Sequence, residues 1–354
     1  MNNLDNFVSQ FAGYSDSYFF YDNTVEIVFD KAEHTYKLVQ GEELIEVPSV
    51  TTVCHIIDKS QILIPWACKM MGERITGSLP SLIESNALNY SNLEDIIFKA
   101  KFAWKDKLEA AGDVGTIAHN WIEQWILNTL AGKLKPEYPS DPQAHKCCLA
   151  AEQWAYNHNV RWMSTETKVF SRNHQYAGTR DGKAYVDSCN DRTCCPYEFK
   201  DKLGAIDWKT GTALYLEYLF QLAAYVMADL EEHPDQKIED FWVIHLGRDD
   251  GEFNPWHIDT NDELEMYYYG FLNCLRLYRS VEHAEQQVKL KKENVRAAKR
   301  EAQKKLQAEQ YKLKCKGADK YKGKRKPVCN DGHPCEYCLK KYAEVQVLTS
   351  VSST

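Results

Sequence analysis

The stretch GAIDWKTG, residues 204–211, decides how the fold of this chain is interpreted. A short apolar run ends in Asp207, and Lys209 follows two positions later. Because side chains alternate along a strand, Asp207 and Lys209 are expected on the same face. Such a pair is either a surface ion pair or the centre of a metal-dependent nuclease, and the rest of the chain has to distinguish these two alternatives.

An Asp/Glu-x-Lys triplet carries little information by itself, because five occur in this chain, at 166–168, 181–183, 198–200, 207–209 and 235–237. Phosphodiester hydrolysis needs a hard cation, which is usually held by one or two carboxylates together with water and phosphate oxygens. A catalytic triplet should therefore have a second carboxylate on a neighbouring strand. Asp181, in the stretch YAGTRDG, is well placed for this role.

The pattern around residues 204–211 predicts a mixed sheet with helices. Strand-like pieces cover 161–171, 175–189, 202–210 and 239–247, an amphipathic helix covers 213–232, and 254–259 extends the sheet. Upstream, 24–53 has β character, and helices are expected over 61–75, 93–111, 113–131 and 143–158. A continuous helix is expected from about 261 to 314.

Four short motifs occur in order along this predicted core: GxxxH (Gly115, His119), GxxD (Gly178, Asp181), DxKT (Asp207, Lys209, Thr210) and QxxxY (Gln221, Tyr225). Together they resemble the RecB-type PD-(D/E)xK nucleases, which include many phage exonucleases. The resemblance covers roughly residues 110–246. It implies an α/β fold with a restriction-endonuclease-like core, in which helices flank a central mixed sheet.

The resemblance also implies a role for each matching residue. The metal ligands, for Mg²⁺ or Mn²⁺, would be His119, Asp181, Asp207 and the backbone carbonyl of Trp208. Imidazole suits Mn²⁺ better than Mg²⁺.

Three further residues complete the implied catalytic set. Lys209 would act on the attacking water, and Gln221 and Tyr225 would position the DNA backbone. Glu166, on the strand before Asp181, would support the metal ligands from outside the coordination shell.

Simpler interpretations exist for these residues when each is taken alone. His119 could be a packed histidine and Tyr225 a core residue. Glu198–Phe199–Lys200 is the main rival triplet, but no apolar strand leads into it. It lies in a polar insertion, 190–202, that lengthens the interval between Asp181 and Asp207. We expect Glu198 and Lys200 to lie apart from the site.

The expected organisation has four parts: an N-terminal β/α region (1–92), the nuclease core (93–275), a charged helical arm (276–314) and a Cys/Lys-rich tail (315–354). Net charge is −8 overall, but 289–327 carries +12. This segment is either a solvated helix or an arm that holds the DNA backbone. The DNA-backbone candidates are Lys291, Lys292, Arg296, Lys299 and Arg300.

Twelve cysteines occur in a chain without a recognisable secretion signal, so disulfides are the less expected use. In the tail, Cys315, Cys329, His333, Cys335 and Cys338 suit a structural Zn²⁺ site. An iron–sulfur cluster or free thiols are the alternatives. The adjacent pairs Cys147/Cys148 and Cys194/Cys195 are poor local chelators and are expected to be structural.

The sequence therefore predicts a metal-dependent deoxyribonuclease, most readily an exonuclease, acting in DNA recombination, repair, replication or degradation. DNA is the expected partner, together with a recombination, annealing or replication protein. A structure-specific endonuclease or an inactive DNA-binding module are the alternatives. No run of about 18 apolar residues is present. A cytoplasmic location in a bacterial or phage-infected cell is expected.

Overall fold

The computed structural model describes residues 15–211, 213–258 and 260–314. The chain divides into two compact units, 1–278 and 279–354. Among the described residues, the first unit contains two sheets, the helices from α2 (Val50–Cys54) to α7 (Leu216–Glu232), and the first turns of α8 (Asn261–Lys314). The described part of the second unit, 279–314, is the remainder of α8. In the described part of the chain, no helix has the length and apolar character needed to cross a membrane.

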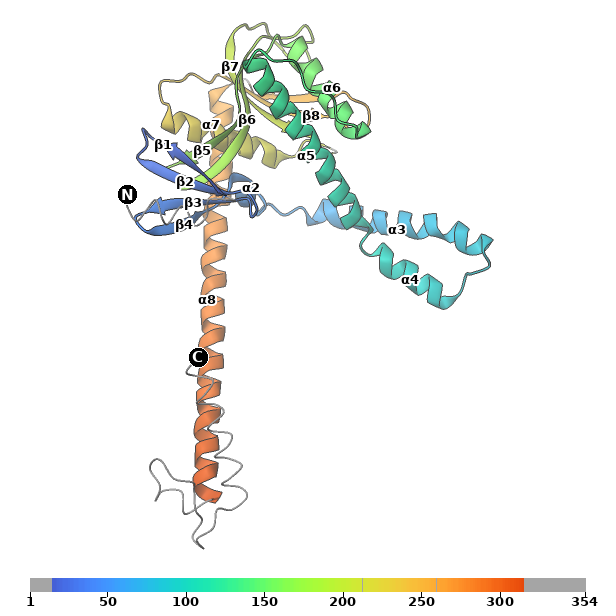
Figure 1. Ribbon diagram of the computed structural model, residues 1–354, viewed down its shortest axis with the longest axis vertical. Coiled ribbons are helices and arrows are strands. Elements are labelled where there is room, and N and C mark those ends of the chain that lie inside the picture. The colour runs from blue at the N-terminus through green and yellow to red at the C-terminus, as the bar shows by residue number, and fades with distance from the viewer. Residues whose placement is uncertain (1–14, 212, 259, 315–354) are drawn as a thin grey trace. The chain divides into compact units, whose positions relative to one another are not determined.

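The larger sheet has the strand order β5 (Arg161–Ser171), β6 (Tyr176–Val186), β7 (Lys202–Lys209), β8 (Asp240–Leu246) and β9 (Phe253–Ile258) (Figure 1). All neighbouring strands are antiparallel except β7 and β8. Parallel neighbours need a crossover connection, and α7 (Leu216–Glu232) supplies it. The mixed α/β architecture expected from the sequence is therefore confirmed, and these elements lie within a few residues of their predicted bounds.

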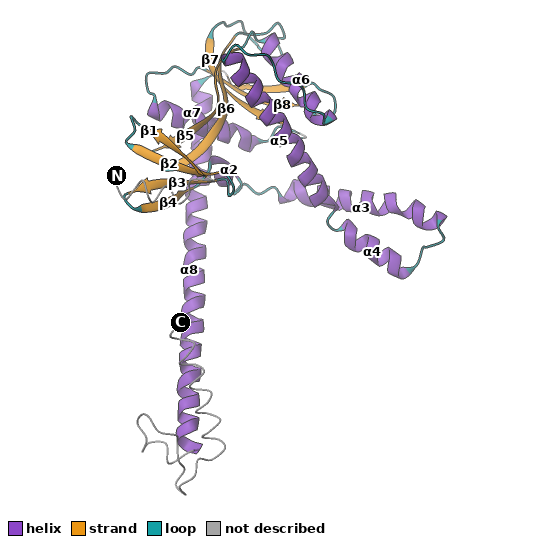
Figure 2. Ribbon diagram, viewed as in Figure 1, coloured by secondary structure: helices purple, strands orange, loops and turns teal. Residues whose placement is uncertain are grey.

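Helices cover both faces of this sheet (Figure 2). One apolar cluster joins the sheet to α7, α2 (Val50–Cys54) and the start of α8. The second joins it to α5 (Ala103–Leu130) and α6 (Pro142–Asn157). Strand β7 contributes to both clusters, because Ala205 packs in the first and Ile206 and Trp208 pack in the second. This alternation directs Asp207 and Lys209 away from the α5/α6 layer.

The smaller sheet is an antiparallel meander of β1 (Ser15–Phe20), β2 (Val25–Asp30), β3 (Thr35–Gln40) and β4 (Glu43–Val47). Its apolar side chains pack on Phe170 and Ala177 of the larger sheet. The chain then turns into α2, because the Ser49 hydroxyl accepts a hydrogen bond from the Thr52 N–H at 3.0 Å and caps the helix. The expectation of β structure through residue 53 was therefore wrong at its end.

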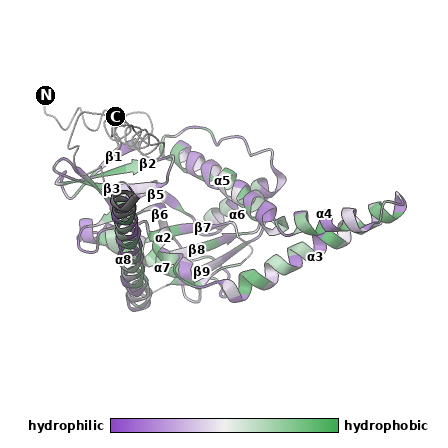
Figure 3. Ribbon diagram, turned by 90° about the horizontal axis from the view of Figure 1, so that it is seen from below, coloured by the Kyte–Doolittle hydropathy of each residue, from purple (hydrophilic) through white to green (hydrophobic). Residues whose placement is uncertain are grey.

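Helices α3 (Ser60–Glu84) and α4 (Tyr90–Ala100) precede α5. The predicted break between helices near residue 112 was wrong, because Gly112 lies inside α5 and the chain turns at Lys101–Phe102 instead. A glycine inside a helix costs only about 1 kcal/mol, which the packing of α5 readily offsets. Helix α3 is hydrophobic along much of its length (Figure 3), yet none of its residues is buried.

A buried ion cluster fixes α7 against β6. The Arg180 guanidinium pairs with Asp229, and the Lys183 Nζ lies 3.1 Å from Asp229 Oδ2. Arg180 and Asp229 have side chains only 1% and 4% exposed. Burial alone would raise the pKa of Asp229, but Arg180 and Lys183 outweigh this effect and lower it.

We predict that Asp229→Asn destabilises the protein by about 3–5 kcal/mol, because the change leaves Arg180 buried without a counter-charge. Urea denaturation followed by tryptophan fluorescence measures this free energy. Asp201→Asn is the matched control, since Asp201 pairs with Arg161 on the surface and should change stability by less than about 1 kcal/mol. Equal effects of the two changes would contradict the assigned role of the buried cluster.

Candidate active site

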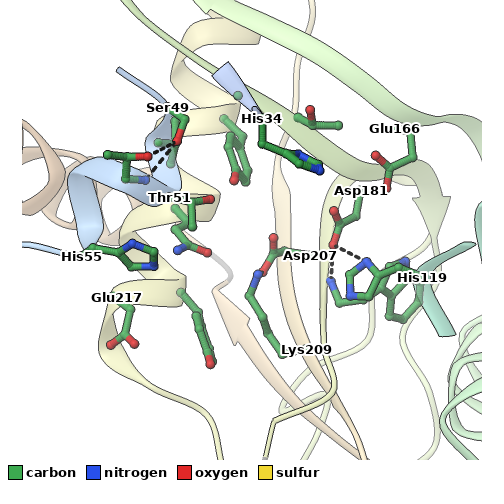
Figure 4. A pocket seen from close by; sticks show the side chains of 18 of the residues that line it. His34, Ser49, Thr51, His55, His119, Glu166, Asp181, Asp207, Lys209 and Glu217 are labelled. Atoms are coloured by element: carbon green, nitrogen blue, oxygen red, sulfur yellow. Dashed lines mark hydrogen bonds and ion pairs between the residues drawn. The ribbon is translucent and has the colours of Figure 1, made fainter. Parts of the chain in front are cut away.

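A pocket of about 720 Å³ opens between the two sheets, α2, α5 and α7 (Figure 4). It is lined by residues from every motif that the sequence singled out in the core. These are His119, Glu166, Gly178, Asp181, Asp207, Trp208, Lys209, Thr210, Gln221 and Tyr225. The geometry thus gathers five separate chain segments at one place.

The pocket forms where β6 and β7 part. The paired residues of these strands end at Gly182 and Ile206, although β7 continues to Lys209. Beyond that point the Trp208 N–H donates a hydrogen bond to Asp181 Oδ2 at 2.8 Å. A carboxylate therefore satisfies a backbone donor that a strand neighbour would otherwise satisfy, and the gap between the strands becomes part of the pocket.

Three side chains beside this gap have the geometry of a metal site. His119, Glu166 and Asp181 each offer a ligand atom, and the three atoms lie within 4.8 Å of one another. His119 Nδ1 is 3.8 Å from Asp181 Oδ2. Asp207 is not a member of this group. The structure thus places Glu166, which the sequence suggested only as a supporting residue, directly with His119 and Asp181.

Glu166 is held in an unusual backbone conformation, with φ of +47°. Among the described residues with positive φ, it alone lies inside a strand. Its strand neighbours pair as Thr165 with Gly182 and Thr167 with Arg180, which sets Glu166 opposite Asp181. Strain at a single residue and two like charges across a ladder are both unfavourable, and both are features of functional sites.

Lys209 and Asp207 form an ion pair inside the pocket. Lys209 Nζ lies 2.5 Å from Asp207 Oδ2, and the two side chains are 18% and 1% exposed. The Lys209 ammonium also lies over the Tyr218 ring, 4.9 Å from its centroid. The rival triplet lies elsewhere, because Glu198 is 82% exposed and pairs with Arg192. Neither Glu198 nor Lys200 lines the pocket.

The electrostatics of the pocket favour a bound cation. Burial, and then Asp181, raise the pKa of Glu166 to about 8. Burial and Asp181 also raise the pKa of Asp207 to about 6, against the opposing effect of Lys209. Burial and Lys209 lower the pKa of His119 to about 4, so its imidazole is neutral at pH 7 and can donate a lone pair. Two carboxylates and a neutral imidazole suit Mn²⁺, and the carboxylates suit Mg²⁺.

Lys209 keeps its proton in this setting. Burial alone would lower the pKa of Lys209, but Asp207 and Asp181 together raise it above its usual value. The group is therefore an ammonium at neutral pH, and it can donate hydrogen bonds and supply positive charge.

The two motif glycines allow close approach of other motif residues. A Cβ at Gly115 would lie 2.8 Å from Thr210 Oγ1, and one at Gly178 would lie 2.4 Å from Tyr225 Cε1. Tyr225 is itself buried, and Gln221 lies one turn before it on α7. Each glycine therefore has a partner in another motif.

Several further pocket residues were not singled out in the sequence. His34 follows β2, His55 follows α2, and Lys168 lies on β5 with its Nζ 4.7 Å from the Phe29 ring centroid. They reach the pocket because the smaller sheet and α2 pack against β5 and β6. Lys168 belongs to one of the five triplets, which was the only available hint.

The remaining predicted residues lie outside this pocket. Lys291, Lys292, Arg296, Lys299 and Arg300 are exposed on the part of α8 that belongs to the second unit. The tail candidates Cys315, Cys329, His333, Cys335 and Cys338 lie outside the described residues.

No protein-family model matches this chain, and no curated protein matches it. Similar solved structures include an alkaline exonuclease (LHK-Exo) from Laribacter hongkongensis, alone and in complex with dAMP. In each case the identity is 14%, the TM-score is 0.25, and the match covers 48% of this chain and 84% of that chain.

We predict that Glu166→Gln raises the melting temperature of the metal-free protein by several degrees at pH 9. The pKa of Glu166 is raised in the folded state to about 8 from 4.5. The stability contributed by the protonated carboxyl is therefore complete below pH 4.5 and is lost as pH rises through 8. The increase in melting temperature of Glu166→Gln over the wild type should shrink steadily toward pH 4.5 and vanish there.

Melting curves in EDTA between pH 4.5 and 9 test this, with the exposed Glu198→Gln as the control. Added Mn²⁺ should reverse the order, because it stabilises the wild type more than the variant. If the melting temperature of Glu166→Gln equals that of the wild type at every pH, then burial and the nearby Asp181 do not raise the pKa of Glu166, and this account is wrong.

We also predict that Gly178→Ala costs about 1–3 kcal/mol, because the new methyl group overlaps the Tyr225 ring. In a Tyr225→Ala background the same change should cost much less, which a double-mutant cycle of urea denaturations would measure. Gly77→Ala on α3 is the control, since no atom lies within 4 Å of its added Cβ. An unchanged cost of Gly178→Ala in the Tyr225→Ala background would exclude this contact as the cause.

Proposed function

We propose that this protein is a Mg²⁺- or Mn²⁺-dependent DNA nuclease with the restriction-endonuclease-like core of the RecB-type PD-(D/E)xK nucleases, acting as an exonuclease. The observation that carries the proposal is the convergence of His119, Glu166 and Asp181 beside the buried Asp207–Lys209 pair. Four motifs spread over more than a hundred residues meet in one pocket, as the resemblance requires.

The cation is held by His119, Glu166 and Asp181 in this proposal. When bound, it supplies positive charge for the phosphate and lowers the pKa of water. The neutral His119 imidazole and the two carboxylates provide suitable ligand atoms. Asp207 has its main contact with Lys209, so it either completes the ligand shell after a small movement or acts by holding Lys209 in place.

Lys209 orients the attacking water and stabilises charge in the transition state. Its raised pKa keeps it protonated, so it acts as a hydrogen-bond donor rather than as a general base. Gln221 and Tyr225 lie on the same face of α7 at the pocket wall. From there their polar groups position the substrate backbone.

The basic residues of α8 contribute to DNA binding in this proposal. Lys291, Lys292, Arg296, Lys299 and Arg300 are exposed on a regular helix. Contacts of such residues with phosphate release counterions, so DNA affinity should fall steeply with salt concentration. Processing of DNA ends in recombination, repair or replication, in a bacterial or phage-infected cell, is the setting that the resemblance favours.

We predict that Asp207→Asn and Lys209→Met each lower DNA cleavage by about 10²-fold or more, because each removes a charge from the reacting centre. The matched controls are Glu198→Gln and Lys200→Met, which alter the rival triplet and should retain full activity. The assay uses linear and circular DNA, each single- and double-stranded, with Mg²⁺ or Mn²⁺ and with EDTA.

Cleavage of linear but not circular DNA supports an exonuclease, whereas cleavage of circular DNA indicates an endonuclease. The proposal fails if the wild type cuts no substrate with either metal. It also fails if the control variants lose as much activity as the Asp207 and Lys209 variants.

A further inference from the structure

The insertion between β6 and β7 gathers a second set of metal-ligating side chains. Cys194 and Cys195 come from this insertion, Cys189 immediately precedes it, and His158 comes from the end of α6. One ligand atom from each of the four lies within 4.8 Å of the others. None of these residues lines the pocket that contains Asp207. The group is therefore a separate site.

The distances within the group match tetrahedral coordination of zinc. With Zn–S near 2.3 Å and Zn–N near 2.0–2.1 Å, a tetrahedron places two sulfurs about 3.8 Å apart and a sulfur and a nitrogen about 3.5 Å apart. The Cys195 Sγ lies 3.5 Å from Cys189 Sγ and 3.9 Å from Cys194 Sγ. The His158 Nε2 lies 3.4 Å from Cys194 Sγ and 3.6 Å from Cys195 Sγ.

Neighbouring groups orient these ligands. His158 Nδ1 lies 2.7 Å from the Trp154 carbonyl oxygen, so Nδ1 carries the proton and Nε2 presents its lone pair to the sulfurs. The Cys189 N–H donates a hydrogen bond to Cys195 Sγ at 3.3 Å, which favours the thiolate. The Cys195 N–H donates to the Asp191 carbonyl at 2.8 Å and closes the loop around the site.

Burial makes the group unlike a set of surface thiols. His158 and Cys195 are fully buried, Cys189 is nearly so, and Cys194 is partly exposed. The His158 ring stacks on the Trp154 ring, with ring centroids 4.9 Å apart. Three thiols and an unshared imidazole nitrogen thus converge in a small volume with an opening at Cys194. A cation can enter there.

We propose that His158, Cys189, Cys194 and Cys195 bind one structural Zn²⁺ ion. Four protein ligands close the coordination shell, which is the arrangement of structural rather than catalytic zinc. The ion would tie the β6–β7 connection to the end of α6. It would thereby hold in place the two strands that carry Asp181 and Asp207. The proposal does not depend on nuclease activity.

Zinc content of the purified full-length protein tests the proposal. The tail cysteines are a second potential source of zinc, so the measurement is made in a background that carries Cys315→Ser, Cys329→Ser, Cys335→Ser and Cys338→Ser. Elemental analysis should find about one zinc per chain in this background. Cys194→Ser should remove it, and Cys194→His, which keeps a ligand, should retain it.

Cys147→Ser is the matched control, because Cys147 is also buried and belongs to an adjacent cysteine pair, but its thiol points to the Leu246 carbonyl. It should leave the zinc content unchanged. If Cys194→Ser does not fold, the proposal is tested instead by reconstituting the background protein with Co²⁺. Intense thiolate-to-cobalt and tetrahedral absorption bands are then expected, and their intensity should correspond to one thiolate-bound Co²⁺ per chain.

Any of the following results would overturn the proposal. The first is a zinc content that Cys194→Ser leaves unchanged, or no tetrahedral cobalt spectrum. The second is iron in place of zinc. The third is a Cys189–Cys195 disulfide in the intact protein, which mass spectrometry under non-reducing conditions would reveal.

Discussion

The hydrogen bond from the Trp208 N–H to the Asp181 carboxylate is the interaction on which the site depends. Ladder pairing between β6 and β7 has already ended at Gly182 and Ile206. A buried N–H left without an acceptor there would cost about 1–3 kcal/mol. Asp181 satisfies it, and in doing so the carboxylate is fixed beside His119 and opposite Glu166. The Asp181 carboxylate is therefore held at the point where β6 and β7 separate.

Helix α7 is aligned with β6 by matched spacing. Gly178 and Arg180 are two residues apart on the strand, and their partners Tyr225 and Asp229 are four residues apart on the helix. Two strand residues advance about 6.6 Å and four helical residues about 6 Å, so both contacts form together. The ion pair sets the rotation of the helix, and the glycine admits the tyrosine ring. Gln221, one turn earlier, is consequently directed to the pocket.

The site is assembled at a cost to stability. Glu166, Asp181 and Asp207 each have a raised pKa because they are buried, and repulsion by Asp181 adds to the effect at Glu166 and Asp207. One lysine in ion-pair contact with Asp207 compensates only part of this repulsion. A fold that keeps such a group without a cation gives up free energy that a core of apolar residues would retain. A bound cation, as proposed above, would relieve this repulsion.

The sequence predicted the strands around the site well and the contacts between distant segments poorly. Alternation and length identify β5 to β8 and α7, because those segments are buried in a regular way. The helical turn at Ser49 was missed, since a capping hydroxyl is a weak signal in an apolar run. The position of Glu166 beside His119 and Asp181 was not predicted, because it depends on strand register, which sets Glu166 opposite Asp181. The proximity of His158 to Cys189 was not predicted, because the two residues are far apart in the chain and meet only after α6 packs on the sheet.

Trp208 links the two proposed metal sites while keeping them apart. Its side chain packs edge-on against Trp154, with ring centroids 5.5 Å apart, and the Trp154 carbonyl oxygen accepts a hydrogen bond from His158 Nδ1. Its neighbours Asp207 and Lys209 face the pocket instead. Thiolates select zinc, whereas carboxylates suit Mg²⁺ and Mn²⁺. The Trp154 and Trp208 side chains lie between the cysteine ligands and the carboxylate ligands, so the two proposed sites do not share a ligand. If both proposals hold, the thiolate site would stabilise β7, the strand that carries Asp207 and Lys209, and would offset part of the repulsion among the buried carboxylates of the pocket.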